Sequence, residues 1–348
     1  MGYNIEKVVP SQELVKDKMP LPINLKEIVN QDRREIANII EGKDKRKLLV
    51  IGPCSAWPNT AVLNYAKELK ELSNKYCDKI KIILRVYTQK PRTVLGWTGP
   101  QNQPNPFSIS DIEQGIYYCR EMMLNILELG LPIADEALFT HNEGYFDDLL
   151  SWVAIGARSS EDQEHRIYAS MLNNPVGIKN PTCGTLDIAC NSVLAAQHTH
   201  VFLLNGKQIR TLGNPHAHLV LRGSNGESNI FIENLLKIDD IFKKKQILNP
   251  SVLIDCSHDN SIEPSSGKKD PLAQPKVLMR VLKNMSEHSR LKTLIKGFMV
   301  ESFILEGKQN LKDFNSIEEI NLNGLSITDA CISLEQTKKL LADFYSYL

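Results

Sequence analysis

The sequence predicts a closed (β/α)8 barrel, a TIM barrel, and three observations lead to that prediction. Short apolar runs typical of buried strands recur along the chain, with mostly helical segments between them. Strict alternation of strands and helices indicates a parallel sheet, and eight such strands can close into a barrel. A polar or ionisable residue follows each run, and the strand ends of such a barrel share one face. An open, doubly wound sheet is the alternative, but its glycine fingerprint GxGxxG is missing.

The eight expected strands are residues 48–52, 82–84, 132–134, 152–156, 175–178, 218–221, 252–254 and 298–300. Apolar residues at helical spacing follow several of them. The helix after the second strand is expected to start at the capping box Ser110-x-x-Glu113 and to stop at Gly130. A closing helix is expected from about Ser326, with Asp329 in its first turn.

Two segments do not fit the repeating unit. Residues 1–47 are polar and contain a predicted helix from about Gln31 to Gly42. We expect them to form an extension that lies against the barrel domain, residues 48–348, or against a neighbouring subunit. Residues 201–210 have the pattern of a tight β-hairpin, because their central Asn-Gly pair supplies positive φ angles. The hairpin is therefore interpreted as a short insertion before the sixth strand.

The composition excludes some classes of partner. The 348 residues carry 41 basic and 41 acidic side chains, so the net charge favours neither nucleic acid nor an anionic membrane. The seven cysteines form no CxxC pair, the first residues lack the apolar core of a signal peptide, and no apolar run is as long as a membrane span. A reducing cytoplasmic location is the expectation.

A first group of side chains at the predicted strand ends is cationic. Arginine and lysine neutralise phosphates and carboxylates, and so many cations in one cleft would repel each other without anions. Each residue alone fits an ordinary surface charge or salt-bridge partner. Their recurrence at strand ends nevertheless predicts a substrate with phosphate and carboxylate groups. The group consists of Arg85, Lys90, Arg92, Arg158, Lys179 and Arg222.

A second group combines one thiol, one imidazole and two carboxylates, in Cys54, His258, Glu301 and Asp329. Mixed sulfur, nitrogen and oxygen ligands suit Mn²⁺, Fe²⁺, Co²⁺ or Zn²⁺ better than Mg²⁺ or Ca²⁺. The spacing is not a local metal motif, so a buried thiol, a strand-end hydrogen bond and a helix cap are the structural alternatives. Glu301 is the member least easily explained by structure alone, because an unpaired buried carboxylate is costly.

Eight segments carry longer motifs: IGPCS (51–55), RVYTQKPRT followed by GW (85–97), SWVAIGARSSEDQEHR (151–166), PVGIKN with GT (175–185), LRG (221–223), IDCSHDNS (254–261), MVESFILEGKQ (299–309) and SITDACI (326–332). With these eight segments in this order, the chain resembles the 3-deoxy-D-arabino-heptulosonate-7-phosphate (DAHP) synthases of the type I bacterial group regulated by aromatic amino acids. The segments span the chain from about residue 48 to its end, so together they are far more specific than any one motif.

The resemblance implies a reaction and a set of site residues. The reaction condenses phosphoenolpyruvate with erythrose 4-phosphate and water, releases phosphate and begins the shikimate pathway, which leads to chorismate and the aromatic amino acids. By matching position, a divalent metal ion would be held by Cys54, His258, Glu301 and Asp329. Phosphoenolpyruvate would be held by Arg85, Lys90, Arg158, Lys179 and Arg222. Arg92 and Thr93 would hold the phosphate of erythrose 4-phosphate. A homodimer or homotetramer is expected.

Three residues are given catalytic roles as hypotheses. The metal would polarise the aldehyde as a Lewis acid, with His258 among its ligands, and Lys90 would protonate the developing alkoxide. Glu136, after the third strand, would orient the water that adds to C2 of phosphoenolpyruvate. The cations would hold both anionic substrates in reacting geometry.

The sequence also departs from the family pattern. Ser55-Ala56-Trp57-Pro58 stands where the family usually reads Ser-Ile-His-Asp. The hairpin, the N-terminal extension and the segment after the third strand build the feedback-inhibitor site in the family. Here the hairpin is short, the extension lacks the usual acidic residues, and residues 138–144 do not match the usual run. We therefore expect weak, altered or absent inhibition by Phe, Tyr and Trp.

Four other functions compete with this prediction. A related enzyme condensing phosphoenolpyruvate with arabinose 5-phosphate is disfavoured by the KPRT segment (90–93). A Schiff-base aldolase using Lys179 would leave Cys54 and Glu301 unexplained. A paralogue acting on a modified erythrose phosphate would account for the departures. A catalytically silent regulatory paralogue is disfavoured because every carried-over site residue is present.

Overall fold

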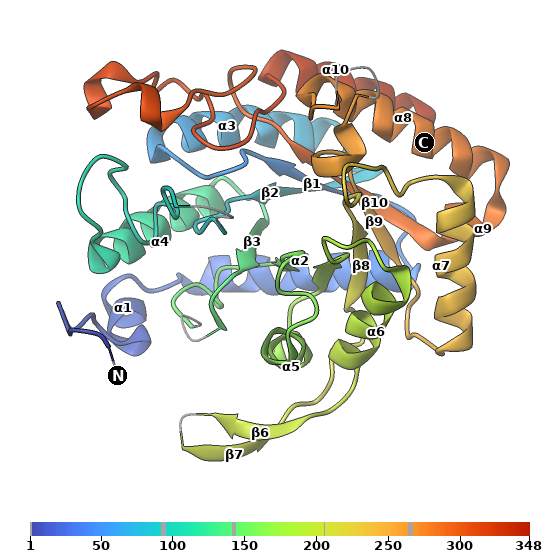
Figure 1. Cartoon of the computed structure of the whole chain (residues 1–348), viewed down its shortest axis with the longest axis horizontal. Helices are drawn as coiled ribbons and strands as arrows, with labels where there is room; N and C mark the ends of the chain where they lie inside the picture. The colour runs from blue at the N-terminus through green and yellow to red at the C-terminus, as the bar shows by residue number, and fades with distance from the viewer. Residues whose placement is uncertain (1, 92–94, 141–143, 205, 264–266) are drawn as a thin grey trace.

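The computed structural model describes residues 2–91, 95–140, 144–204, 206–263 and 267–348. Its centre is a closed barrel of parallel strands in the order β1-β10-β9-β8-β5-β4-β3-β2, which confirms the predicted fold (Figure 1). The barrel strands are β1 (Lys47–Gly52), β2 (Ile80–Arg85), β3 (Ile133–Ala137), β4 (Trp152–Ile155), β5 (Val176–Lys179), β8 (His218–Leu221), β9 (Val252–Asp255) and β10 (Ile295–Glu301).

Helices surround the barrel, and each strand connects to the next through at least one of them or through a longer loop. The outer helices are α3 (Asn59–Lys75), α4 (Ile112–Glu128), α5 (Gln163–Met171), α6 (Leu186–Gln197), α7 (Ile232–Lys244), α8 (Gln274–Glu287), α9 (Ser289–Leu294) and α10 (Leu334–Tyr347). Short 3-10 turns occupy His258–Ser261, Pro271–Ala273, Leu311–Asp313 and Ile317–Glu319. The described helices include none that is long and apolar enough to cross a membrane.

The strands are buried on both faces, which explains their continuous apolar sequences. In β1, Leu48 and Val50 belong to the cluster inside the barrel, whereas Leu49 and Ile51 belong to the larger cluster between the strands and the outer helices. This alternation follows from the two-residue period of a strand. Seven of the eight barrel strands contribute to both clusters, and β5 contributes only to the outer one, because Gly177 takes the inner position against Trp152 and Val220.

The N-terminal extension packs against one end of the barrel. It contains α1 (Gln12–Lys18) and α2 (Ile23–Glu41), so the helix expected from about Gln31 begins earlier, directly after Pro22. Ile36, Ile39 and Ile40 of α2 pack with the residues inside the barrel. Figure 1 shows α2 running beside the strands, and the extension is thus part of the barrel's packing.

The predicted hairpin is confirmed as β6 (Val201–Leu204) and β7 (Lys207–Arg210), an antiparallel pair separate from the barrel. It projects away from the other elements (Figure 1). Its side chains are mostly exposed, including Leu203 at 74%. Asn205 of the turn lies outside the described residues.

Two helix starts differ from prediction. The cap of α4 is Asp111, whose side chain accepts a hydrogen bond from Gln114 N, and not Ser110. The closing helix does not start at Ser326, because α10 begins after Ser333, which forms a capping box with Gln336. Asp329 therefore lies in a loop that returns over the strand ends and not in a first helical turn. Cap residues with the right spacing occurred at both places, so local pattern could not choose between them.

Candidate active site

A cavity of about 550 Å³ opens at the carboxyl ends of the strands. This volume lies within the range of about 300–1,000 Å³ that is usual for small-molecule sites. Ten residues predicted for the site line it, namely Cys54, Arg85, Lys90, Glu136, Arg158, Lys179, Arg222, His258, Glu301 and Asp329. Arg92 and Thr93 lie outside the described residues. The barrel topology brings these positions together from more than 270 residues of intervening chain, between Cys54 and Asp329.

Two of the cations are paired with carboxylates of the chain itself, so part of their mutual repulsion is offset within the protein. Arg85 Nη2 lies 3.2 Å from Glu301 Oε1, and both side chains are 1% exposed. Lys179 Nζ lies 3.1 Å from Glu136 Oε2. Pairing offsets the desolvation of buried charges, so the cations can persist there without a ligand.

The cavity nevertheless keeps an excess of positive charge. Among its described lining residues are seven lysines and arginines, which include Lys269 and Lys312, against three carboxylates. The sequence prediction missed these two lysines because both are exposed and neither directly follows a buried strand. The cavity is thus suited to a substrate with several negative charges.

Tyr87 is a further lining residue that the sequence prediction missed. Its buried ring lies 4.1 Å from the Arg85 guanidinium carbon, 5.6 Å from Lys90 Nζ and 5.3 Å from Lys179 Nζ. The face of an aromatic ring attracts cations, so Tyr87 stabilises three of them at once. Tyr87 could have been predicted from the sequence, because it lies between the predicted site residues Arg85 and Lys90.

Three members of the expected metal set meet in the cavity. One ligand atom each from Cys54, Glu301 and Asp329 lies within 4.8 Å of the others. Glu301 Oε1 is buried, and apart from its ion pair with Arg85 it accepts no hydrogen bond of good geometry from the part of the chain that the structure describes. A buried acceptor with such neighbours fits a metal ligand, because a buried polar atom otherwise needs a hydrogen bond. One thiol and two carboxylates also form a donor set that a divalent transition ion accepts.

His258 lines the same cavity but does not belong to the group of three within 4.8 Å. Its Nδ1 lies 2.8 Å from Asp255 Oδ2, which leaves Nε2 as the ring nitrogen available to a ligand. Burial opposes ionisation of Asp255, but His258 beside it holds the pKa of that carboxyl below its usual range. A carboxylate that orients the far nitrogen is the usual support of a ligating histidine.

Lys90 contacts the same group through its ammonium. Lys90 Nζ donates to Cys54 O at 2.5 Å and lies 3.2 Å from Cys54 Sγ. Burial disfavours its charge, but Cys54 beside it raises the pKa of Lys90 above its ordinary value. The side chain therefore carries a proton near neutral pH.

Glu136 enters the cavity because Gly156 leaves room for it. A Cβ atom at Gly156 would lie 2.6 Å from Glu136 Oε1. Burial opposes ionisation of Glu136, but Lys179 and Lys90 hold the pKa of this carboxyl below its usual range. The side chain is thus an ionised acceptor at neutral pH.

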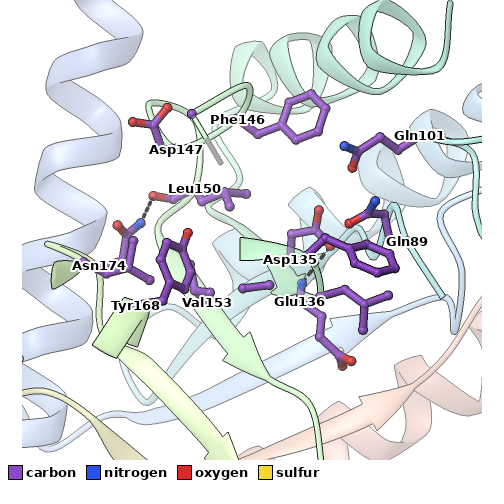
Figure 2. Close-up of a pocket in the computed structure, with 15 residues that line it drawn as sticks. Gln89, Gln101, Asp135, Glu136, Phe146, Asp147, Leu150, Val153, Tyr168 and Asn174 are labelled. Carbon is purple, nitrogen blue, oxygen red and sulfur yellow. Dashed lines mark hydrogen bonds between the residues drawn. The ribbon is translucent and has the colours of Figure 1, made fainter. Parts of the chain in front are cut away.

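A second, smaller cavity of about 60 Å³ lies behind β3 (Figure 2). The segment after β3 contributes Phe139, Gly144 and Phe146 to its lining, and Asp135 and Glu136 of β3 line it as well. Glu136 lines both cavities. Leu138 also lines both, so the two spaces adjoin at these two residues.

Comparison with known proteins agrees with the geometry. The model of the DAHP synthetase I family matches residues 21–342. A Tyr-sensitive phospho-2-dehydro-3-deoxyheptonate aldolase of Salmonella typhimurium is 37% identical over 352 residues, which cover 99% of this chain and 94% of that protein. A Trp-sensitive one of Buchnera aphidicola is 36% identical, with 97% and 95% covered.

The fold is shared as well. A solved structure of phospho-2-dehydro-3-deoxyheptonate aldolase from Francisella tularensis SCHU S4 superimposes with a TM-score of 0.91 at 35% identity. The match covers 99% of this chain and 98% of that chain. With the family model, the relatives and the fold in agreement over nearly the whole length, the chain belongs to the DAHP synthetase I family of metal-dependent synthases.

Proposed function

We propose that the chain condenses phosphoenolpyruvate with erythrose 4-phosphate and water to give DAHP and phosphate. The observation that carries this proposal is the convergence of ten predicted site residues on one cavity of about 550 Å³ with an excess of positive charge. Both substrates are anions, and together they carry two phosphates and one carboxylate. Family membership supports the same reaction.

Each substrate has its own cations in this proposal. Arg85, Lys90, Arg158, Lys179 and Arg222 hold phosphoenolpyruvate, because all of them line the cavity. Arginine forks suit its carboxylate and phosphate, which accept paired hydrogen bonds. Arg92 and Thr93 hold the phosphate of erythrose 4-phosphate, an assignment that rests on the KPRT motif alone.

The metal would be held by Cys54, His258, Glu301 and Asp329. A divalent ion such as Mn²⁺, Fe²⁺, Co²⁺ or Zn²⁺, when bound there, supplies Lewis acidity to the aldehyde oxygen. Arg85, at 3.2 Å from Glu301, keeps that carboxylate ionised and ready to ligate. Burial raises the pKa of the Cys54 thiol, so its deprotonation depends on a nearby cation.

The chain's own groups complete the reaction. C3 of phosphoenolpyruvate forms a bond with the aldehyde carbon, while Lys90 gives its proton to the aldehyde oxygen, which becomes a hydroxyl. Glu136 orients a water whose oxygen adds to C2. The C2–O bond to phosphate then breaks, phosphate leaves with the electron pair, and a ketone remains, while the two protons of the added water pass to Lys90 and to the departing phosphate. The paired cations keep both anions in place during these steps.

The test is consumption of phosphoenolpyruvate in the presence of erythrose 4-phosphate, after treatment with a chelator and after addition of each metal. We expect loss of the enol absorbance that depends on a metal and on both substrates. Consumption with a modified erythrose phosphate only would favour a specialised paralogue. Borohydride trapping without metal dependence would favour a Schiff base at Lys179. Absence of turnover with any aldose and metal would overturn the proposal and favour a silent paralogue.

Weak or absent inhibition by Phe, Tyr and Trp is part of the proposal. The segment after β3 lines a cavity of only about 60 Å³, below the range of about 300–1,000 Å³ for small-molecule sites. Named relatives differ in their inhibitor, since one is Tyr-sensitive and another Trp-sensitive. Inhibition constants for each amino acid test this point, and a value in the micromolar range for any of them would contradict it.

We also propose a homodimer or homotetramer in a reducing cytoplasm. Apolar side chains are exposed on the extension and the hairpin, with Tyr3 at 69%, Val8 at 86% and Leu203 at 74%. Exposed apolar groups of this kind often mark contacts between subunits. All seven cysteines are free thiols. Sedimentation of the full chain tests the assembly, and a monomer at micromolar concentration would contradict it.

A further inference from the structure

Asp135 in β3 is a buried carboxylate to which the steps above give no role. Its side chain accepts three hydrogen bonds. Oδ1 accepts from Thr88 N at 3.1 Å and from Glu136 N at 2.7 Å, and Oδ2 bonds to Thr88 Oγ1 at 2.7 Å. The residue is 5% exposed and stands beside Glu136 in Figure 2.

The carboxylate takes the place of a backbone acceptor between β2 and β3. Their ladder runs from Leu84 N to Pro132 O at 2.9 Å and from Val86 N to Ala134 O at 2.8 Å. The next donor in this series, Thr88 N, binds the Asp135 side chain. The two segments thus separate at the strand ends while they stay bridged.

The bridge lies next to two groups of the proposed chemistry. Glu136 directly follows Asp135, and Lys90 lies two residues after Thr88. A second contact fixes the same segment, because Gln101 N donates to Thr88 O at 3.2 Å. A shift of Thr88 or Glu136 would therefore displace the proton donor and the water-orienting carboxylate relative to each other.

We propose that Asp135 is a positioning residue that fixes Lys90 and Glu136 in their relative geometry through its bonds to Thr88 and Glu136. This inference rests on the proposed function. Its action needs acceptor atoms and shape but no negative charge. Burial raises the pKa of Asp135 to about 7, which agrees with a carboxyl group that has no cation as partner.

The experiment compares Asp135→Asn, Asp135→Ala and Thr88→Val with the wild type. Asparagine keeps an oxygen for both N–H groups and an N–H₂ for Thr88 Oγ1, so we expect its kcat within about 3-fold of the wild type. Asp135→Ala should lower kcat by about 10- to 100-fold, with a change of less than about 3-fold in KM for phosphoenolpyruvate. Thr88→Val loses one of the three bonds and should lower kcat by about 3- to 10-fold.

Asp239→Ala is the matched control. This aspartate is 7% exposed and bonds to Lys243 and Arg290 on the outer helices, away from the cavity. Its loss should lower the thermal midpoint without lowering kcat. The control separates a general loss of stability from misplacement of the catalytic groups.

A second measurement does not depend on activity. Amide hydrogen exchange in peptides that contain Thr88 and Glu136 should be at least about 10-fold faster in Asp135→Ala and unchanged in Asp135→Asn. If the wild type consumes no phosphoenolpyruvate, the proposed function fails, while exchange still decides whether the bridge exists.

Three results would overturn the inference. They are a wild-type kcat in Asp135→Ala, an Asp135→Asn variant as slow as Asp135→Ala, and unchanged amide exchange in Asp135→Ala. If the alanine variant does not fold, Thr88→Val decides, and a wild-type kcat in that variant overturns the inference.

Discussion

At the scale of single residues, the candidate site depends on charged side chains that are buried in pairs. Glu301 lies against Arg85, and Glu136 lies against Lys179. Removing one member of such a pair leaves the other desolvated, which typically costs about 3–5 kcal/mol. Substitutions in these pairs would therefore reduce stability together with activity. The roles of Lys90 and Glu136 are therefore tested with Lys90→Met and Gly156→Ala, two substitutions outside these pairs.

Lys90→Met should lower kcat by about 100- to 10,000-fold, because it removes the proton donor and keeps the length of the side chain. The Cys54 carbonyl loses its bond to Nζ, but the backbone of the segment stays in place. Steady-state kinetics and calorimetric binding of phosphoenolpyruvate are the measurements. Near-normal turnover with normal binding would rule out Lys90 as the acid.

Gly156→Ala should lower kcat by about 10-fold through displacement of Glu136. The added Cβ would lie 2.6 Å from Glu136 Oε1, the far end of a flexible side chain, so the fold should persist. A double-mutant cycle with Glu136→Gln tests the route. If Gly156 acts through Glu136, the double variant is no slower than Glu136→Gln alone, and additive losses would contradict that route.

At the scale of elements, parallel strands and their covering helices were predictable, whereas helix ends were not. All eight strands were identified because burial on both faces gives continuous apolar runs, as in β1 and β10. The starts of α4 and α10 were wrong because each region contains more than one capping residue. The choice between Ser110 and Asp111 depends on where the chain leaves the barrel, and that is a tertiary property.

The strand β8 contains a buried histidine whose protonation should limit stability in acid. His218 Nε2 accepts from Trp152 Nε1 at 3.2 Å, and Nδ1 bonds to His216 O at 2.9 Å. These contacts fit the neutral ring only, since protonated Nε2 cannot accept. Burial lowers the pKa of His218 from 6.5 to about 4.

The sign of the pH effect follows from this shift. Between pH 4 and 6.5 the unfolded chain binds more protons at this position, so this part of the stability is present above pH 6.5 and is lost as the pH falls toward 4. From pH 7 to pH 5 the loss should be about 2 kcal/mol. Urea unfolding of His218→Gln should show a pH dependence smaller by this amount. An unchanged dependence would mean that His218 is not buried as the neutral ring.

At the scale of the whole molecule, the expected metal ligands join distant parts of the chain. Cys54 follows β1, Glu301 ends β10, and Asp329 lies in the loop before α10. An ion held by all of them would link the first strand of the barrel to the last. Metal binding should therefore stabilise the closed barrel as well as support turnover.

The thermal midpoint should fall after chelation and should rise again with Mn²⁺ or Co²⁺. At a metal concentration 100 times the dissociation constant, the stabilisation is about 2.7 kcal/mol. Differential scanning fluorimetry checks this, with Cys54→Ala as the variant in which the response should disappear. A midpoint that does not respond to metal in the wild type would argue against a resident ion at this set.

The sequence by itself determined the barrel class, the order of the strands along the chain and the residue types that follow them. Burial on both faces and the alternation with helices leave few other arrangements. Ten of the predicted site residues accordingly line one cavity. These features are local or periodic, so they are readable without coordinates.

Only the tertiary structure decided which of those side chains pair and what surrounds them. The sequence does not show that Arg85 meets Glu301, that Tyr87 faces three cations, or that Asp135 replaces a backbone acceptor. These contacts join strands far apart in the chain, and they depend on register and side-chain direction once the barrel has closed. Distances of a few ångströms between such groups determine their charge, and closure of the barrel sets those distances.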